Sequence, residues 1–62
     1  MEPNTAYNLL ASIAVRNTID PYLLLETITE DSEASVELRN LCSSSNRVGF
    51  EEYVQQFIDS NF

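Results

Sequence analysis

Apolar residues recur at every third or fourth position along most of this chain, a pattern that predicts amphipathic helices. The segment 50–60 shows it best, because its apolar positions follow the spacing i, i+3, i+4, i+7 and i+8. Those residues are Phe50, Tyr53, Val54, Phe57 and Ile58. The segment 6–16 carries a similar stripe, made of Ala6, Leu9, Leu10, Ile13 and Ala14. We therefore expect one helix near each end of the chain.

Two shorter helices are expected between them, over 21–30 and 32–42. Asp20 followed by Pro21 suits a helix start, because aspartate caps free backbone N–H groups and proline fits the first helical position. Asp31 or Ser32 is placed to cap the next helix. The apolar positions of the two helices are Leu24, Leu25 and Ile28, and then Ala34, Leu38, Leu41 and Cys42. Each helix thus has one face suited to a shared core.

Polar residues separate these segments. Thr5 is the expected N-cap of the first helix, and Asn17 and Thr18 are expected to end it. The run 43–46, Ser-Ser-Ser-Asn, favours a loop because its side chains compete for backbone hydrogen bonds. No segment alternates well enough to predict a strand. The sequence therefore predicts an all-α fold, a small bundle of three to four short helices in a single domain over 1–62.

The start of the last helix is expected to follow Gly49 as N-cap. Glu51 and Glu52 would then lie in the first turn, where the helix dipole favours carboxylates. Val48 would pack on Tyr53 as a hydrophobic staple.

The small size of the domain limits its core. A chain of 62 residues has a marginal core, and small domains commonly add disulfides, a metal or a partner chain. Cys42 is the single cysteine and histidine is absent, so neither an internal disulfide nor a Cys/His zinc site can form. Regular helix packing or a homodimer remains. Phe57, Ile58 and Phe62 are the residues expected to extend an apolar surface toward a second copy, which keeps a self-assembling structural role open.

The charge balance restricts the partners. Ten acidic residues face three arginines (Arg16, Arg39 and Arg47) and no lysine, which gives a net charge of −7. This charge opposes direct binding to nucleic acid or to an anionic membrane and favours a protein with a basic surface. No segment approaches the ~20 apolar residues of a membrane span. With one free cysteine and no basic, apolar leader, the expected compartment is the cytoplasm.

Enzyme chemistry has few candidate residues here. Nucleophilic catalysis needs an activated nucleophile with a nearby base, yet histidine and lysine are both absent. Cys42 falls on the apolar stripe of its helix, which indicates a core position rather than a reactive thiol. Gly49 is the lone glycine, so no phosphate-binding loop is present. We expect no catalytic activity and no cofactor.

One stretch, 43–54, is similar to the end of an EF-hand calcium loop and its exiting helix. With Glu52 set at the last loop position, Ser43 and Ser45 occupy two ligand positions, but Leu41 falls on the first and Asn46 replaces the usual glycine. An ordinary helix start explains the same residues. Calcium sensing is kept as an alternative, and no metal site is predicted.

Uncompensated carboxylates gather in the middle of the chain. Glu26 and Glu30, and then Glu33 and Glu37, are spaced i, i+4, where like charges repel by a few tenths of a kcal/mol per pair on a helix. The helical periodicity places Leu23 and Val36 off the apolar faces and among these carboxylates. An apolar residue surrounded by carboxylates is typical of a docking site for a basic surface. The predicted partner-binding residues are Leu23, Glu26, Glu30, Asp31, Glu33, Val36 and Glu37.

These observations favour a small acidic adaptor or inhibitor that occupies a basic surface of a larger intracellular protein. In type, though not in motif, the chain resembles the host-takeover and anti-defence proteins encoded by bacteriophages. A sharper alternative is a DNA mimic, whose carboxylates imitate phosphates and fill a nucleic-acid-binding groove. A third hypothesis, a helix-turn-helix DNA binder, follows from the short, closely joined helices 21–30 and 32–42. Against it, the second of these helices offers only Arg39 as a cation.

Overall fold

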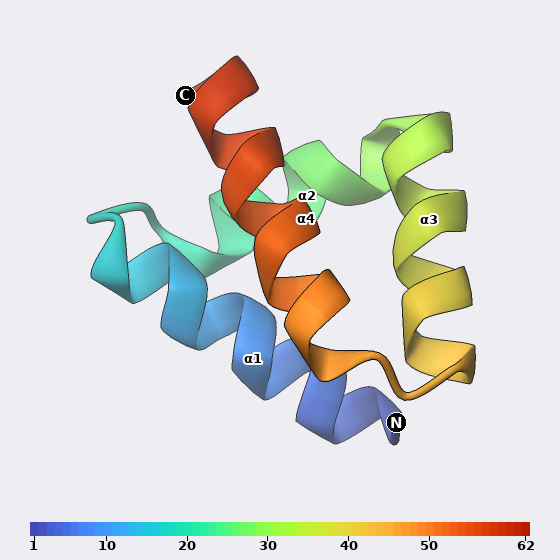
Figure 1. Ribbon diagram of the computed structural model, residues 1–62. Coiled ribbons are helices and arrows are strands. Elements are labelled where there is room, and N and C mark those ends of the chain that lie inside the picture. The colour runs from blue at the N-terminus through green and yellow to red at the C-terminus, as the bar shows by residue number, and fades with distance from the viewer.

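In the computed structural model, residues 1–62 form four α-helices and no strand (Figure 1). The helices are α1 (Pro3–Arg16), α2 (Pro21–Glu30), α3 (Ser32–Ser43) and α4 (Arg47–Asn61). Each helix packs on the next along the chain, and α4 also packs on α1. Figure 1 shows α4 crossing in front of α2, with α1 below and to the left and α3 to the right. The predicted all-α bundle is confirmed.

The core consists of eleven buried apolar residues. They are Leu9, Leu10, Ile13, Ala14, Leu24, Ile28, Ala34, Phe50, Val54, Phe57 and Ile58. All but one come from α1, α2 and α4, and α3 contributes only Ala34. Three further apolar residues of α3, Leu38, Leu41 and Cys42, are half-buried at the edge of the core. Consequently α3 is the least deeply packed helix.

Two aspartates cap helices as the sequence predicted. The Asp20 carboxylate accepts the Tyr22 N–H at 2.8 Å at the start of α2. Asp31 accepts the Ala34 N–H at 3.0 Å at the start of α3. Such caps typically stabilise a helix by about 1 kcal/mol. Asp31 is also the only residue between α2 and α3, so the cap fixes the bend between them.

The predicted start of α1 is wrong by a few residues. The helix begins at Pro3, and Glu2 is the flanking residue without a side-chain cap. Thr5 therefore lies inside the helix instead of capping it. Proline at the first helical position needs no partner for its nitrogen, which lets the helix begin earlier than the apolar stripe indicates.

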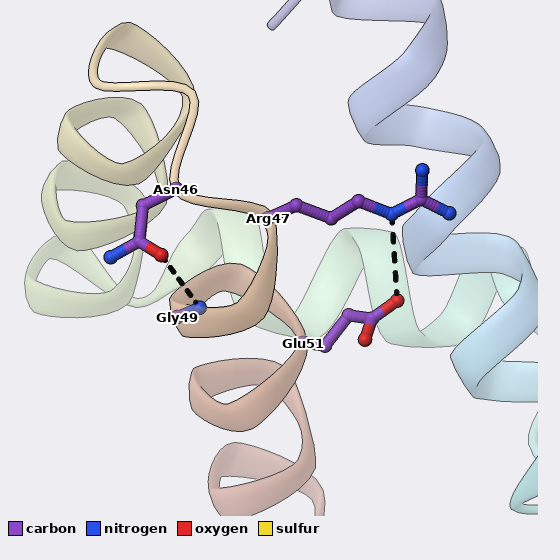
Figure 2. Close-up of polar contacts among 4 residues, drawn as sticks. All are labelled: Asn46, Arg47, Gly49 and Glu51. Atoms are coloured by element: carbon purple, nitrogen blue, oxygen red, sulfur yellow. Dashed lines mark hydrogen bonds and ion pairs between the residues drawn. The ribbon is translucent and has the colours of Figure 1, made fainter.

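The predicted start of α4 is also wrong. Asn46 is the cap, and its Oδ1 accepts the Gly49 N–H at 2.9 Å (Figure 2). Asparagine is a stronger N-cap than glycine, so the helix starts at Arg47. Glu51 and Glu52 therefore lie beyond the first turn, although the sequence predicted them within it. Val48 is 66% exposed and lies inside α4, whereas a hydrophobic staple uses the residue before the N-cap.

The end of α1 is attached to α4 by two side-chain amides. The Asn17 side-chain Nδ2 donates to Gln55 Oε1 at 3.0 Å, and Gln55 Nε2 donates to Asn17 Oδ1 at 3.0 Å. Asn17 also donates to the Ile13 carbonyl at 2.7 Å. The next residue, Thr18, has a φ of 58°, and this left-handed turn directs the chain into α2.

The expected apolar surface for self-assembly is mostly internal. Phe57 and Ile58 are buried in the core of this chain because they lie on the same face of α4 as Phe50 and Val54. Only Phe62, which is 52% exposed, is left of that group.

Candidate partner-binding site

The predicted site residues divide between two helices. Leu23, Glu26 and Glu30 lie on the side of α2 opposite the buried Leu24 and Ile28, and all three are exposed. Their spacing places them along one line of the helix surface. The structure thus groups these three residues as the sequence predicted.

One residue of this surface was missed in the sequence. Tyr22 is 73% exposed and lies one turn before Glu26 on the same side of α2. The helical periodicity could have revealed it, because Tyr22 is off the stripe formed by Leu24 and Ile28. Tyrosine is enriched at protein interfaces, since its ring supplies apolar area and its hydroxyl a hydrogen bond. We refer to Tyr22, Leu23, Glu26 and Glu30 together as the α2 face.

The carboxylates of the α2 face are costly to the folded chain. Glu30 is the last residue of α2 and Glu26 lies one turn before it, at the end of the helix where the dipole disfavours negative charge. They also repel each other at i, i+4. The last turn of α2 contains no basic residue, and the one ion pair of the chain joins Arg47 to Glu51 at 3.9 Å on α4 (Figure 2). Neither Glu26 nor Glu30 therefore has a cation of the chain within 4.0 Å.

The carboxylates of α3 are in a different situation. Asp31 caps the helix and Glu33 lies in its first turn, where the dipole favours a negative charge. Both therefore stabilise the fold. We refer to Asp31, Glu33 and the half-buried Glu37 as the α3 acidic cluster.

The α3 acidic cluster acts electrostatically on Tyr53 of α4. Burial raises the pKa of Tyr53 above its ordinary value of 10.0, and the negative charges of Glu33, Asp31 and Glu37 raise it further. Asp31 and Glu33 also line a shallow groove of about 250 Å³ together with Tyr53 and polar residues near the end of α4. The negative potential at this groove is therefore a property of the fold.

Val36 belongs to neither group. It is 52% exposed and lies on the outer side of α3, away from the buried Ala34. An exposed valine of this kind is common on protein surfaces.

The loop that resembles an EF-hand is much shorter in the structure. Leu41 and Ser43 are part of α3, and Arg47 begins α4, which leaves residues 44–46 as the connection. A calcium loop needs twelve residues with ligands at alternate positions. No three cysteine, aspartate or glutamate side chains come together where they could hold a metal ion.

Known protein-family models, curated proteins and solved structures include no match to this chain. None of the four helices has both the length and the apolar character needed to cross a membrane. The geometry and charge of the described surfaces are therefore the observations that bear on function.

Proposed function

We propose that this chain is a small protein-binding module, an adaptor or inhibitor, whose α2 face docks on a basic surface of a larger protein. The single observation that carries the proposal is the uncompensated position of Glu26 and Glu30 beside the exposed Tyr22 and Leu23. Carboxylates that destabilise their own helix are best explained by charges that a partner supplies.

A basic partner would offset both the repulsion between Glu26 and Glu30 and their unfavourable interaction with the helix dipole. Lysine or arginine side chains placed against Glu26 and Glu30 would neutralise the repulsion and the opposing dipole. Tyr22 and Leu23 would provide the apolar contact that excludes water around these ion pairs. The net charge of −7 would add long-range attraction and speed association with a basic surface.

The α3 acidic cluster has a supporting part in this proposal. Asp31 and Glu33 already stabilise α3, so these two carboxylates need no partner to explain their presence. The negative potential of this cluster, which helps to raise the pKa of Tyr53, would still attract a basic surface toward the neighbouring α2 face. We therefore expect them to affect the association rate more than the lifetime of the complex.

The test begins with affinity capture by the wild-type chain and by the variant Glu26→Gln/Glu30→Gln. The matched control is Glu51→Gln/Glu52→Gln, which removes the same charge from α4. We expect a partner that the wild type and the control retain, with an affinity reduced about tenfold or more in the α2 variant and falling as salt increases. Equal affinities for the two variants, or binding that salt leaves unchanged, would refute the electrostatic docking.

DNA mimicry is the second candidate, favoured by the scarcity of ion pairs. Of ten carboxylates, only that of Glu51 has a cation within 4.0 Å. Inhibitors of the phage-encoded type that this chain resembles would fit either mechanism. Duplex DNA should compete with a mimic for the captured partner, whereas an adaptor should bind in its presence. The helix-turn-helix alternative gains no support, because Asp31 alone joins α2 to α3 where that motif has a turn of three or four residues.

A further inference from the structure

A second surface differs from the α2 face in shape and in charge. It is an open cleft of about 280 Å³ between α1 and α3, two helices that do not pack closely on each other. Its floor is formed by Leu25 of α2 and Phe50 of α4. The cleft is the largest recess in the molecule, and most of its lining is apolar.

Both walls of the cleft follow the periodicity of a helix. The α1 wall consists of Pro3, Ala6, Tyr7 and Leu10. The α3 wall consists of Ser35, Leu38, Arg39 and Cys42. Each set is spaced i, i+3, i+4, i+7, so each wall is about two turns, or roughly 10 Å, long. A groove of this form accepts an amphipathic helix that inserts apolar side chains at the same spacing.

The charge of the cleft is opposite to that of the whole chain. Arg39 is its only charged lining residue, and no carboxylate lines it although the chain has ten. Arg39 has no carboxylate within 4.0 Å. The guanidinium therefore stands at the edge of an apolar surface without an internal counter-ion, which makes the cleft complementary to an apolar group that carries a negative charge at its border.

We propose that the α1–α3 cleft binds an amphipathic helix of a partner protein, with apolar side chains in the groove and one aspartate or glutamate paired with Arg39. The open shape favours a helix over a small molecule, because ligand pockets usually enclose most of their ligand. A second copy of this chain is disfavoured, because two molecules of charge −7 repel each other. The cleft and the α2 face are separate surfaces, so this proposal does not depend on the preceding one.

The test is a selection from a displayed library of helical peptides. Each position of the library offers an apolar residue, glutamate, lysine or glutamine, and the targets are the wild type, Arg39→Gln and Arg16→Gln. The last variant is the control, because it removes an equal charge at the end of α1 outside the cleft. We expect peptides selected by the wild type and the control to carry apolar residues at i, i+3 or i+4 and i+7, with glutamate at one fixed position. Selection on Arg39→Gln should lose that glutamate, and the best peptide should bind this variant about fivefold more weakly.

The binding position is checked by NMR titration of the wild type with the selected peptide. Amide shifts concentrated on the walls and floor of the cleft support the proposal. It is overturned if no peptide is selected, if no acidic position is enriched, or if the shifts map to the α2 face. It is also overturned if the cleft signals of the free protein shift with its own concentration, which would identify a second copy as the occupant.

Discussion

The opposite roles of Glu30 and Glu33 can be separated by one pair of charge reversals. Glu30 ends α2, where the helix dipole opposes its charge, and Glu33 begins α3, where the dipole favours it. Each also has a like charge one turn away on its own helix, Glu26 and Glu37 respectively. The variants Glu30→Lys and Glu33→Lys change the net charge equally, so the general relief of repulsion is the same in both.

The expected free energies follow from these positions. Glu30→Lys removes the i, i+4 repulsion from Glu26 and adds an attraction to it, and each of these two effects is worth about 0.2–0.5 kcal/mol. It also removes an unfavourable interaction with the helix dipole and adds a favourable one, and each of these is worth about 0.3–1 kcal/mol. With allowance for solvent screening, the variant should be more stable than the wild type by about 1 kcal/mol or more. In Glu33→Lys the pair term stabilises and the dipole term destabilises, so its stability should be unchanged or slightly lower.

Thermal unfolding followed by circular dichroism at low salt measures the difference. A gap of 1 kcal/mol corresponds to a Tm difference of about 4–8 °C for a domain of this size. The gap between Glu30→Lys and Glu33→Lys should narrow in concentrated salt, because both sites are exposed. Equal Tm values for the two variants, or a Glu30→Lys chain less stable than wild type, would refute the assignment of Glu30 as a residue the fold does not need.

Three further outcomes test the packing of the bundle. A Cβ at Gly49 would lie 2.5 Å from the Asn46 side-chain nitrogen, so it would displace the Asn46 cap. Gly49→Ala should therefore leave stability nearly unchanged, because about 1 kcal/mol gained in helix propensity is offset by a similar loss of cap energy. In urea denaturation, the same change should therefore stabilise an Asn46→Ala chain by about 1 kcal/mol, and equal effects in both backgrounds would contradict this coupling. Asn17→Ala should destabilise the chain by about 1–2 kcal/mol, because it removes both hydrogen bonds between Asn17 and Gln55 and leaves Gln55 with only its bond to Asp59. An unchanged urea midpoint would show that water replaces the pair. Because the pKa of Tyr53 is raised in the folded chain, the resulting stability is present below pH 10.0 and is lost as pH rises through the higher folded value. Tyr53→Phe should remove that part of the alkaline loss, and an identical pH profile for the variant would disprove it.

The helices themselves were predictable because the apolar stripes and the aspartate caps agree. Asp20 and Asp31 mark helix starts that the structure reproduces. The errors fall where a local side chain outweighs the stripe, as when Asn46 starts α4 before its first core residue. The relative placement of helices was not predictable, because periodicity gives the buried face of each helix but not its neighbour.

The candidate surfaces were predictable only in part. Exposure of Leu23, Glu26 and Glu30 follows from the position of Leu24 and Ile28 on the same helix. The electrostatic effect of the α3 carboxylates on Tyr53 was not foreseen, because it depends on how α3 packs against α4. The same holds for the α1–α3 cleft, whose walls are separated by more than twenty residues of sequence.

A helix with one fully buried residue and three half-buried ones has a consequence for the motions of the molecule. Ala34 is the only fully buried residue of α3, while α1, α2 and α4 share the rest of the core among themselves. We expect the amide protons of α3 to exchange with solvent through local opening before those of the other helices, since opening α3 uncovers fewer fully buried residues than opening α1, α2 or α4. A ligand bound in the α1–α3 cleft would slow this exchange. Increased protection of the α3 amides would therefore reveal that the cleft is occupied.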